Sequence, residues 1–156
     1  MVDSNSQTRK VKAMRYVLSS KIHKATVTQA ELSYIGSISI DQNLMEKVGL
    51  WPGERVLIVS NTSGTRLETY TIPVTRPGTI CMNGACAHLI GVGEEIIIMG
   101  FTLSDRPIKP RSILVDKENK FVRDLEDDKA CNELFAPGLG YPPFTSTEPP
   151  PEVNFQ

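Results

Sequence analysis

The sequence predicts a mainly β fold, a small β-barrel or sandwich with a few short helices. Short runs of β-branched, aliphatic and aromatic residues recur between residues 16 and 125, and turn residues separate them. Helix start signals occur at only two or three places, and each precedes a short stretch. A chain of 156 residues, 40% of them hydrophobic, is long enough to bury one core without disulfides.

The first elements are strand-like residues 16–28, which predict one or two strands. Thr28 and Glu31 have the spacing of a capping box, so we expect a short helix to start after Thr28. Asp41 is a suitable N-cap for a second short helix over residues 42–50, and Gly49 is suited to end it.

The later elements read as strands joined by turns. Residues 55–61 and 66–74 predict a hairpin, because a Gly-containing turn separates them. Two single strands are expected over residues 79–83 and 94–101, and a second hairpin over residues 110–125.

Three segments follow from this pattern. We expect a flexible lead over residues 1–13, one folded domain over residues 14–135 and a tail over residues 136–156. The tail carries six of the eleven prolines, a composition typical of extended or disordered chain.

Composition argues against several function classes. The net charge of −1 gives no field that would attract nucleic acid or an anionic membrane, and no run approaches the roughly 20 apolar residues of a membrane span. Cys81, Cys86 and Cys131 lack zinc-site spacing, so we expect reduced thiols, no metal and a cytoplasmic protein. Phosphate-binding and dinucleotide-binding fingerprints are also missing.

The stretch YIGSISIDQ, residues 34–42, raises a question about Gly36-Ser37. This pair is an ordinary turn dipeptide, or else a bond that the Ser37 hydroxyl cuts by attacking the Gly36 carbonyl. A serine hydrolase is a further alternative. It lacks support because no G-x-S-x-G elbow is present and no carboxylate is placed to orient His23 or His88.

Strand periodicity gathers further polar side chains. Lys21 and His23 share one face of their strand, and Arg66, Glu68 and Tyr70 share a face of theirs. These side chains are either the solvent-exposed face of a sheet, or a site in which two cations bind carboxylates and a phenol donates a proton. The segment NGACAH, residues 83–88, is a tight turn into a short helix, or a place where small side chains let a ligand reach backbone N–H groups.

Five motifs in order complete the pattern: K-I-H at 21–23, Y-x-G-S with I-D-Q at 34–42, N-T-x-G-x-R-x-x-T-Y at 61–70, N-G-A-x-A-H at 83–88 and V-G-E at 92–94. From about Tyr16 to Phe101 the chain resembles the pyruvoyl-dependent L-aspartate α-decarboxylases, which make β-alanine for pantothenate and coenzyme A. The resemblance implies a six-stranded double-psi β-barrel and a homotetramer with active sites between subunits. It also implies self-cleavage between Gly36 and Ser37.

The same resemblance implies the chemistry. Strain at the glycine bend and a donor for the developing oxyanion would help Ser37 to cut the chain and become a covalent pyruvoyl group, without pyridoxal phosphate or metal. L-Aspartate would form a Schiff base with that group and lose CO₂, and Tyr70 would return the proton. The implied substrate-binding residues are Lys21, Arg66, Thr69, Asn83, Gly84, Ala85 and Cys86, with Thr69 also assisting cleavage and Tyr34 next to the cut.

Some features fit the resemblance less well. Thr69 falls on the strand face opposite Arg66 and Tyr70, and Glu68 would repel a dianionic substrate unless it points away or pairs with a cation. Cys86 stands where the family commonly has alanine. An unprocessed β-barrel binding protein of the same fold is the alternative, and the sequence leaves open whether a maturation factor takes part.

Overall fold

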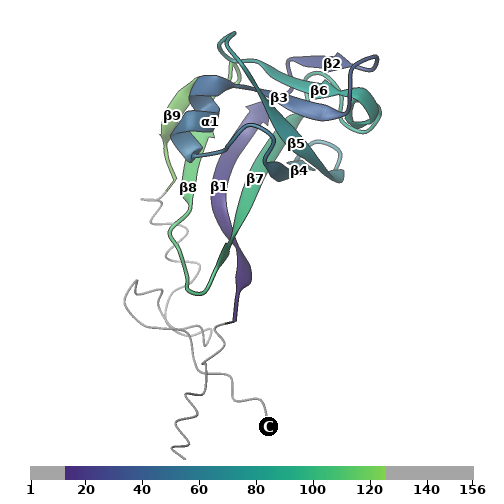
Figure 1. Cartoon of the computed structure of the whole chain (residues 1–156). Helices are drawn as coiled ribbons and strands as arrows, with labels where there is room; N and C mark the ends of the chain where they lie inside the picture. Colours follow the sequence, from purple (N-terminus) through teal and green to yellow (C-terminus); the bar gives the residue numbers. More distant parts are fainter. Residues whose placement is uncertain (1–12, 126–156) are drawn as a thin grey trace, which may run out of the picture.

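Nine β-strands form one sheet in the computed structural model of the chain, which describes residues 13–125 (Figure 1). Their order is β2-β6-β3-β5-β4-β7-β1-β8-β9, so six strands, β6 to β1, form the centre. The mainly β prediction is confirmed, and the sheet is consistent with a small β-barrel. The predicted tail, most of the predicted lead and Cys131 lie outside the described residues.

The bounds of the elements are as follows. The strands are β1 (Arg15–Thr26), β2 (Gln29–Glu31), β3 (Ser37–Asp41), β4 (Arg55–Ser60), β5 (Arg66–Val74), β6 (Ile80–Asn83), β7 (Glu95–Ser104), β8 (Arg111–Val115) and β9 (Phe121–Asp124). The helices are α1 (Gln42–Val48) and the 3₁₀ helix η1 (Gly84–His88). Both predicted hairpins are confirmed, because β4 pairs antiparallel with β5 and β8 with β9.

Helix α1 begins and ends where its capping residues predict. The Asp41 carboxylate accepts a hydrogen bond from the backbone N–H of Asn43 at 2.9 Å, which satisfies a donor of the first turn. Gly49 ends the helix in the left-handed conformation with a φ of 74°. The second carboxylate oxygen of Asp41 accepts from the N–H of Gly78 at 2.8 Å, so this cap also fixes the turn before β6.

The helix predicted after Thr28 is wrong. Residues 29–31 form strand β2, parallel to β6, and the Thr28 hydroxyl bonds the backbone N–H and C=O of Ile80, both at 3.0 Å. The Glu31 carboxylate accepts from the N–H and hydroxyl of Ser33 instead of closing a capping box. Pairing with a distant strand therefore overrides the local helix signal.

The core lies on one face of the central strands. Each of these strands alternates inward and outward, and the inward residues include Ile38, Ile40, Ile58, Ile80, Met82 and Ile98, all 0% exposed. Helix α1 adds Leu44, Met45 and Val48 to the same cluster.

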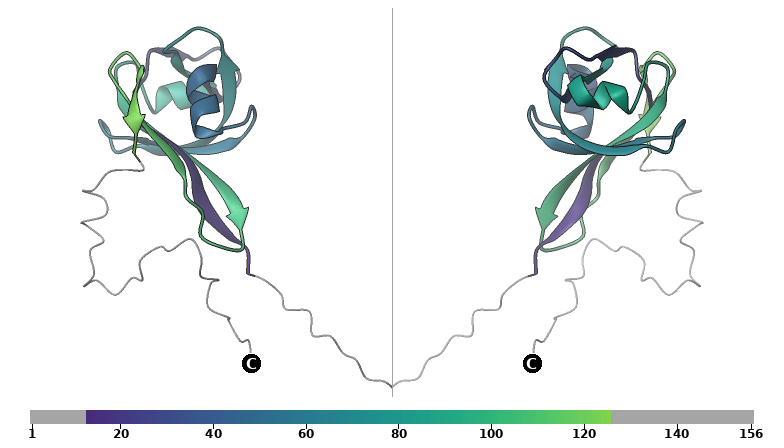
Figure 2. Two further views of the ribbon diagram at one scale, coloured as in Figure 1. Left: turned by 90° about the vertical axis from the view of Figure 1, so that its left-hand side faces the viewer. Right: turned by 90° about the vertical axis from the view of Figure 1, so that its right-hand side faces the viewer.

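Part of the sheet projects beyond the core. The first part of β1 and the last part of β7 extend away from the body as a two-stranded arm (Figure 2).

At the other end of β1, the buried Asn119 side chain holds three segments together. Its amide accepts from the N–H of Thr26 at 2.7 Å and donates to the C=O groups of Thr26 and Gly78 at 2.9 and 2.8 Å.

Candidate active site

Ser37 is the first residue of β3 and is completely buried. Gly36 forms the bend directly before it, so the predicted bend is confirmed. Gly36 is not among the described glycines with a positive φ, and the expected strain is therefore not found in its φ. The nucleophile of the candidate bond sits at the junction between an exposed turn and a buried strand.

A polar cluster surrounds the Ser37 hydroxyl on the face of β3 and β6 opposite the core. In the antiparallel register Ser37 lies opposite Asn83, and Ser39 lies opposite Cys81. The Asn83 amide nitrogen donates to Ser37 Oγ at 2.8 Å and to Ser39 Oγ at 2.9 Å. We call these four side chains, Ser37, Ser39, Cys81 and Asn83, the Asn83 cluster.

The Asn83 cluster suits a serine that acts as a nucleophile. The Ser37 hydroxyl donates to the backbone C=O of Ile35 at 3.3 Å, while its oxygen accepts from Asn83. A buried N–H that points at this oxygen stabilises the negative charge that develops on it as its proton leaves. This donor is on the attacking oxygen, whereas the predicted donor for the developing oxyanion would have to reach the Gly36 carbonyl oxygen.

Gly84 packs against the backbone of the bend that contains Gly36. Its φ of +58° lies in the left-handed region. A Cβ atom at this position would lie 2.6 Å from the C=O oxygen of Tyr34 and 2.8 Å from the nitrogen of Gly36. Only glycine fits this contact, so η1 starts directly over the candidate cleavage site.

Replacement of Gly84 by alanine should displace the 34–36 turn and slow any cleavage there. We expect a loss of roughly 1–3 kcal/mol in unfolding free energy, since the new methyl group meets backbone atoms and the φ is unfavourable. Chemical denaturation and a cleavage time course measure the two effects. The control is Gly53→Ala, because Gly53 has a φ of +77° with no atom within 4 Å of its Cβ position. Equal cleavage rates in both variants would contradict this role of Gly84.

Tyr70 and Thr69 approach Ser37 through strand pairing. Strand β5 runs parallel to β3, with Thr71 beside Ile38, so Tyr70 and Ser37 each directly precede a paired residue. Tyr70 is 38% exposed and Thr69 is half-buried, in line with the predicted opposite faces. A phenol is therefore placed on the strand next to the serine.

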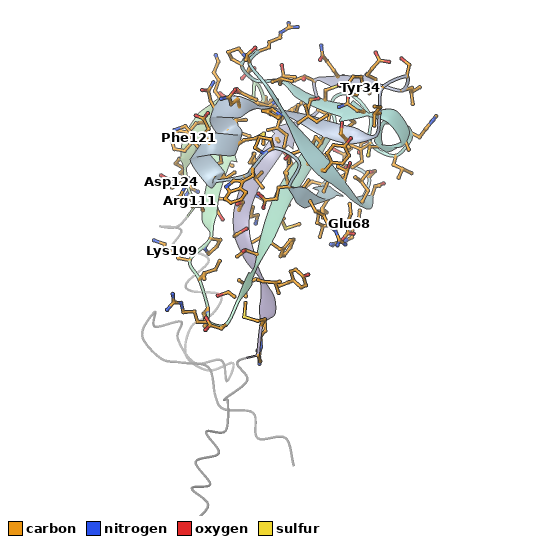
Figure 3. The ribbon with its side chains drawn as sticks, in the orientation of Figure 1. Tyr34, Glu68, Lys109, Arg111, Phe121 and Asp124 are labelled. Carbon is orange, nitrogen blue, oxygen red and sulfur yellow. The ribbon has the colours of Figure 1, made fainter. Side chains whose placement is uncertain are left out.

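Glu68 does not leave an unpaired anion beside Arg66 and Tyr70. Its carboxylate forms an ion pair with Arg55 on β4, and Figure 3 shows Glu68 projecting from the outer side of the sheet. Both side chains are exposed, so the pair adds little stability, but it neutralises the charge that would repel a dianion. Arg66 lies exposed at the start of β5.

The predicted residues on β1 lie further from Ser37 in the sheet order. Lys21 and His23 lie on β1, and β5, β4 and β7 separate this strand from β3. Burial lowers the pKa of His23, Lys21 adds to this, and within residues 13–125 its Nδ1 atom has no hydrogen-bond partner. On η1, Ala85 and His88 are exposed, whereas Cys86 packs against the core.

A hollow of about 590 Å³ leads to the outer face of β3 and β6. Its lining includes Tyr34, Ser39, Cys81 and Asn83, and it contains none of Lys21, Arg66 and Tyr70. In Figure 3 Tyr34 lies at the end of the sheet that carries β2 and β6. Within a single chain, Ser37 and the Asn83 amide therefore lie together. The predicted carboxylate-binding cations, Lys21 and Arg66, do not line the hollow beside them.

Sequence reasoning did not assign a role to Ser39, Cys81 or Arg55. A sequence signal existed for Ser39 and Cys81, because residues two apart in a strand share a face: Ser39 shares that of Ser37, and Cys81 shares that of Asn83. This spacing points to the cluster only once β3 is known to pair with β6, and no local pattern reveals that pairing.

Within the described part of the chain, no group of three or more His, Cys, Asp or Glu side chains is arranged to hold a metal ion. The same residues include no helix that is long and apolar enough to cross a membrane.

The fold and site define a mainly β protein with a buried serine placed at a glycine bend. Comparison with known proteins narrows this class, because the family profile described as aspartate decarboxylase matches residues 13–122. An aspartate 1-decarboxylase of Caldicellulosiruptor bescii is 48% identical over 122 residues, covering 74% of this chain and 95% of the relative. Those of Neisseria meningitidis and Bacillus subtilis are 47% and 43% identical, covering 71% and 74% of this chain and 91% and 95% of the relatives. The chain belongs to the aspartate decarboxylase family.

Proposed function

We propose that this protein decarboxylates L-aspartate to β-alanine and CO₂, for pantothenate and coenzyme A synthesis, with a pyruvoyl group that it makes from its own Ser37. Family membership supports the reaction. The observation that carries the assignment to Ser37 is its burial next to a glycine bend, with the Asn83 amide on its oxygen.

Cleavage begins when Ser37 Oγ attacks the Gly36 carbonyl carbon and its proton passes to the departing amide nitrogen. The C–N bond breaks, and an ester links the two parts of the chain. Loss of the Cα proton of residue 37 with cleavage of its Cβ–O bond then frees residues 1–36 as a carboxylate. Water replaces the remaining enamine nitrogen, which leaves as ammonia and converts residue 37 to a ketone.

The surroundings of residue 37 fit this group. Oγ departs with the carboxylate of residues 1–36, which frees the buried Asn83 N–H beside residue 37 as a hydrogen-bond donor. Gly84 lets the backbone of the 34–36 turn lie where a side chain would clash with it. When present, the pyruvoyl group provides the carbonyl that takes the substrate amine and the sink for the electrons released with CO₂. Tyr70 lies on the adjacent strand as the proton donor.

The substrate carboxylates would be bound by Arg66 and Lys21, with Thr69, Ala85 and Cys86 completing the site. The position of Lys21 on β1 favours a site that is shared between subunits of a homotetramer. The arm also needs a partner, because Tyr16 is 76% exposed and Leu103, opposite it on β7, is 51% exposed. A maturation factor would act on the 34–36 turn, which is exposed apart from the half-buried Gly36.

The test is the intact mass of the denatured protein, followed by an assay for β-alanine from L-aspartate. We expect fragments of residues 1–36 and 37–156, the second lighter by one ammonia than a chain that starts with free serine. A single uncut chain that persists with added extract of the producing cells, or a cut chain without β-alanine production, would contradict the proposal.

A further inference from the structure

The amide of Asn83 has two ends of nearly equal shape, and only one of them is a donor. In the structure the NH₂ end faces Ser37 and Ser39, while the oxygen accepts from the Cys81 thiol with an Sγ–Oδ1 distance of 3.3 Å. All three polar positions of this side chain are thus occupied by members of the Asn83 cluster. The side chain is 3% exposed, so water has little access to it.

The direction of this amide matters most while Ser37 reacts. A serine hydroxyl is both donor and acceptor, and it tolerates either end of an amide. The alkoxide that forms as Ser37 attacks only accepts, so a reversed amide would place two oxygens against each other. Something other than residue 37 must therefore keep the NH₂ end directed at it.

We propose that Cys81 and Ser39 are positioning residues that hold the NH₂ end of Asn83 toward Ser37 Oγ during cleavage. This inference rests on the proposed function. Cys81 gives the amide oxygen a donor on the side away from Ser37, and Ser39 gives the second N–H an acceptor. Together they leave the first N–H free for residue 37.

The state of the thiol agrees with this role. Burial raises the pKa of the Cys81 thiol, and the Glu31 carboxylate acts in the same direction. The thiol therefore remains protonated, and a donor, at neutral pH. A thiolate would instead repel the amide oxygen.

Packing gives no alternative reason for these polar groups. The residues that alternate with them, Ile38, Ile40, Ile80 and Met82, face the core and are all 0% exposed. Cys81 and Ser39 are 7% and 9% exposed on the other face, where they line the hollow. Buried polar side chains in a row need a partner for each donor and acceptor, and Asn83 supplies it.

The test compares Cys81→Ala, which removes the donor, with Cys81→Ser, which keeps one. The matched control is Ser20→Ala, which removes a buried hydroxyl that donates to the Val48 C=O at 2.8 Å, on β1 and outside the cluster. Each freshly purified precursor is followed by intact mass to give a cleavage rate. Tm is measured for every variant, and the cut wild-type protein is assayed for β-alanine formation from aspartate.

We expect Cys81→Ala to cleave more slowly by roughly 3- to 10-fold, the size typical of one hydrogen bond. Cys81→Ser should recover most of the cleavage rate, and Ser20→Ala should lower Tm with little change in that rate. Ser39→Ala should also cleave more slowly, since the second N–H of Asn83 then loses its acceptor.

Three outcomes would overturn the positioning role. One is a wild-type cleavage rate in Cys81→Ala, and another is an equal loss of cleavage rate in Cys81→Ala and Cys81→Ser. The third is a loss that follows Tm in all variants, Ser20→Ala included. Wild-type protein that cuts but does not act on aspartate would contradict the proposed substrate, while the cleavage rates would still decide the role of Cys81.

Discussion

Ser37→Ala should remain a single chain of 156 residues and should form no β-alanine from L-aspartate. The substitution removes the only atom that can attack the Gly36 carbonyl from residue 37, and with it the source of the proposed pyruvoyl group. Intact mass and a β-alanine assay measure the two losses. The fold should persist, because alanine fits the buried position and Asn83 keeps its bond to Ser39. Unfolding free energy should fall by about 1 kcal/mol.

A matched control is available in the same turn. Ser33 is exposed, and its hydroxyl bonds the Glu31 carboxylate instead of the Asn83 cluster. Ser33→Ala should therefore cut at the wild-type rate and retain activity. Decarboxylation by the uncut Ser37→Ala chain would exclude a cofactor made from Ser37, and cleavage at the same bond would exclude Ser37 as the nucleophile.

Local chemistry made much of the fold predictable. Asp41 and Gly49 bound helix α1 because their capping interactions involve only neighbouring residues. The hairpins were predictable for the same reason, since a short turn fixes which strands pair. The segment after Thr28 shows the limit, because its pairing partner β6 lies some fifty residues away and overrides a local signal. Asn119 is a second case, since three segments that meet only in the folded chain decide its role.

The motifs predicted the candidate site better than the chemistry of the individual residues did. The residues alone left Gly36-Ser37 as either a turn or a cut site, and only the ordered set of motifs favoured cleavage. What sequence could not give is how Asn83 is held. The contact between Ser37 and Asn83 depends on strand register, and the thiol of Cys81 would otherwise pass as a small core residue. Glu68 likewise gained its explanation from Arg55, a cross-strand partner on β4.

Tyr70→Phe should separate the two activities of Ser37. The variant keeps the ring and loses only the hydroxyl, so cleavage between Gly36 and Ser37 should proceed and the two fragments should appear by mass. Decarboxylation should fall, because no phenol then returns a proton to the substrate carbon that has lost CO₂. General acid catalysis of this kind contributes roughly 10²- to 10⁴-fold, and we expect kcat to fall within that range.

The position of Tyr70 makes this variant informative. It follows Thr69 on β5 and directly precedes Thr71, which pairs with Ile38, so its ring lies on the strand beside residue 37. Tyr16→Phe is the control, because that tyrosine is 76% exposed on β1, which β5, β4 and β7 separate from β3 in the sheet. Full kcat in Tyr70→Phe would remove Tyr70 as the donor. If Tyr70→Phe instead failed to cleave, the Tyr70 hydroxyl would be needed for self-cleavage. The same side chain would then act in both self-cleavage and decarboxylation. A normal cut with slow turnover is the result that the strand geometry favours, since the phenol contacts neither Asn83 nor Ser37 through any hydrogen bond of the described residues.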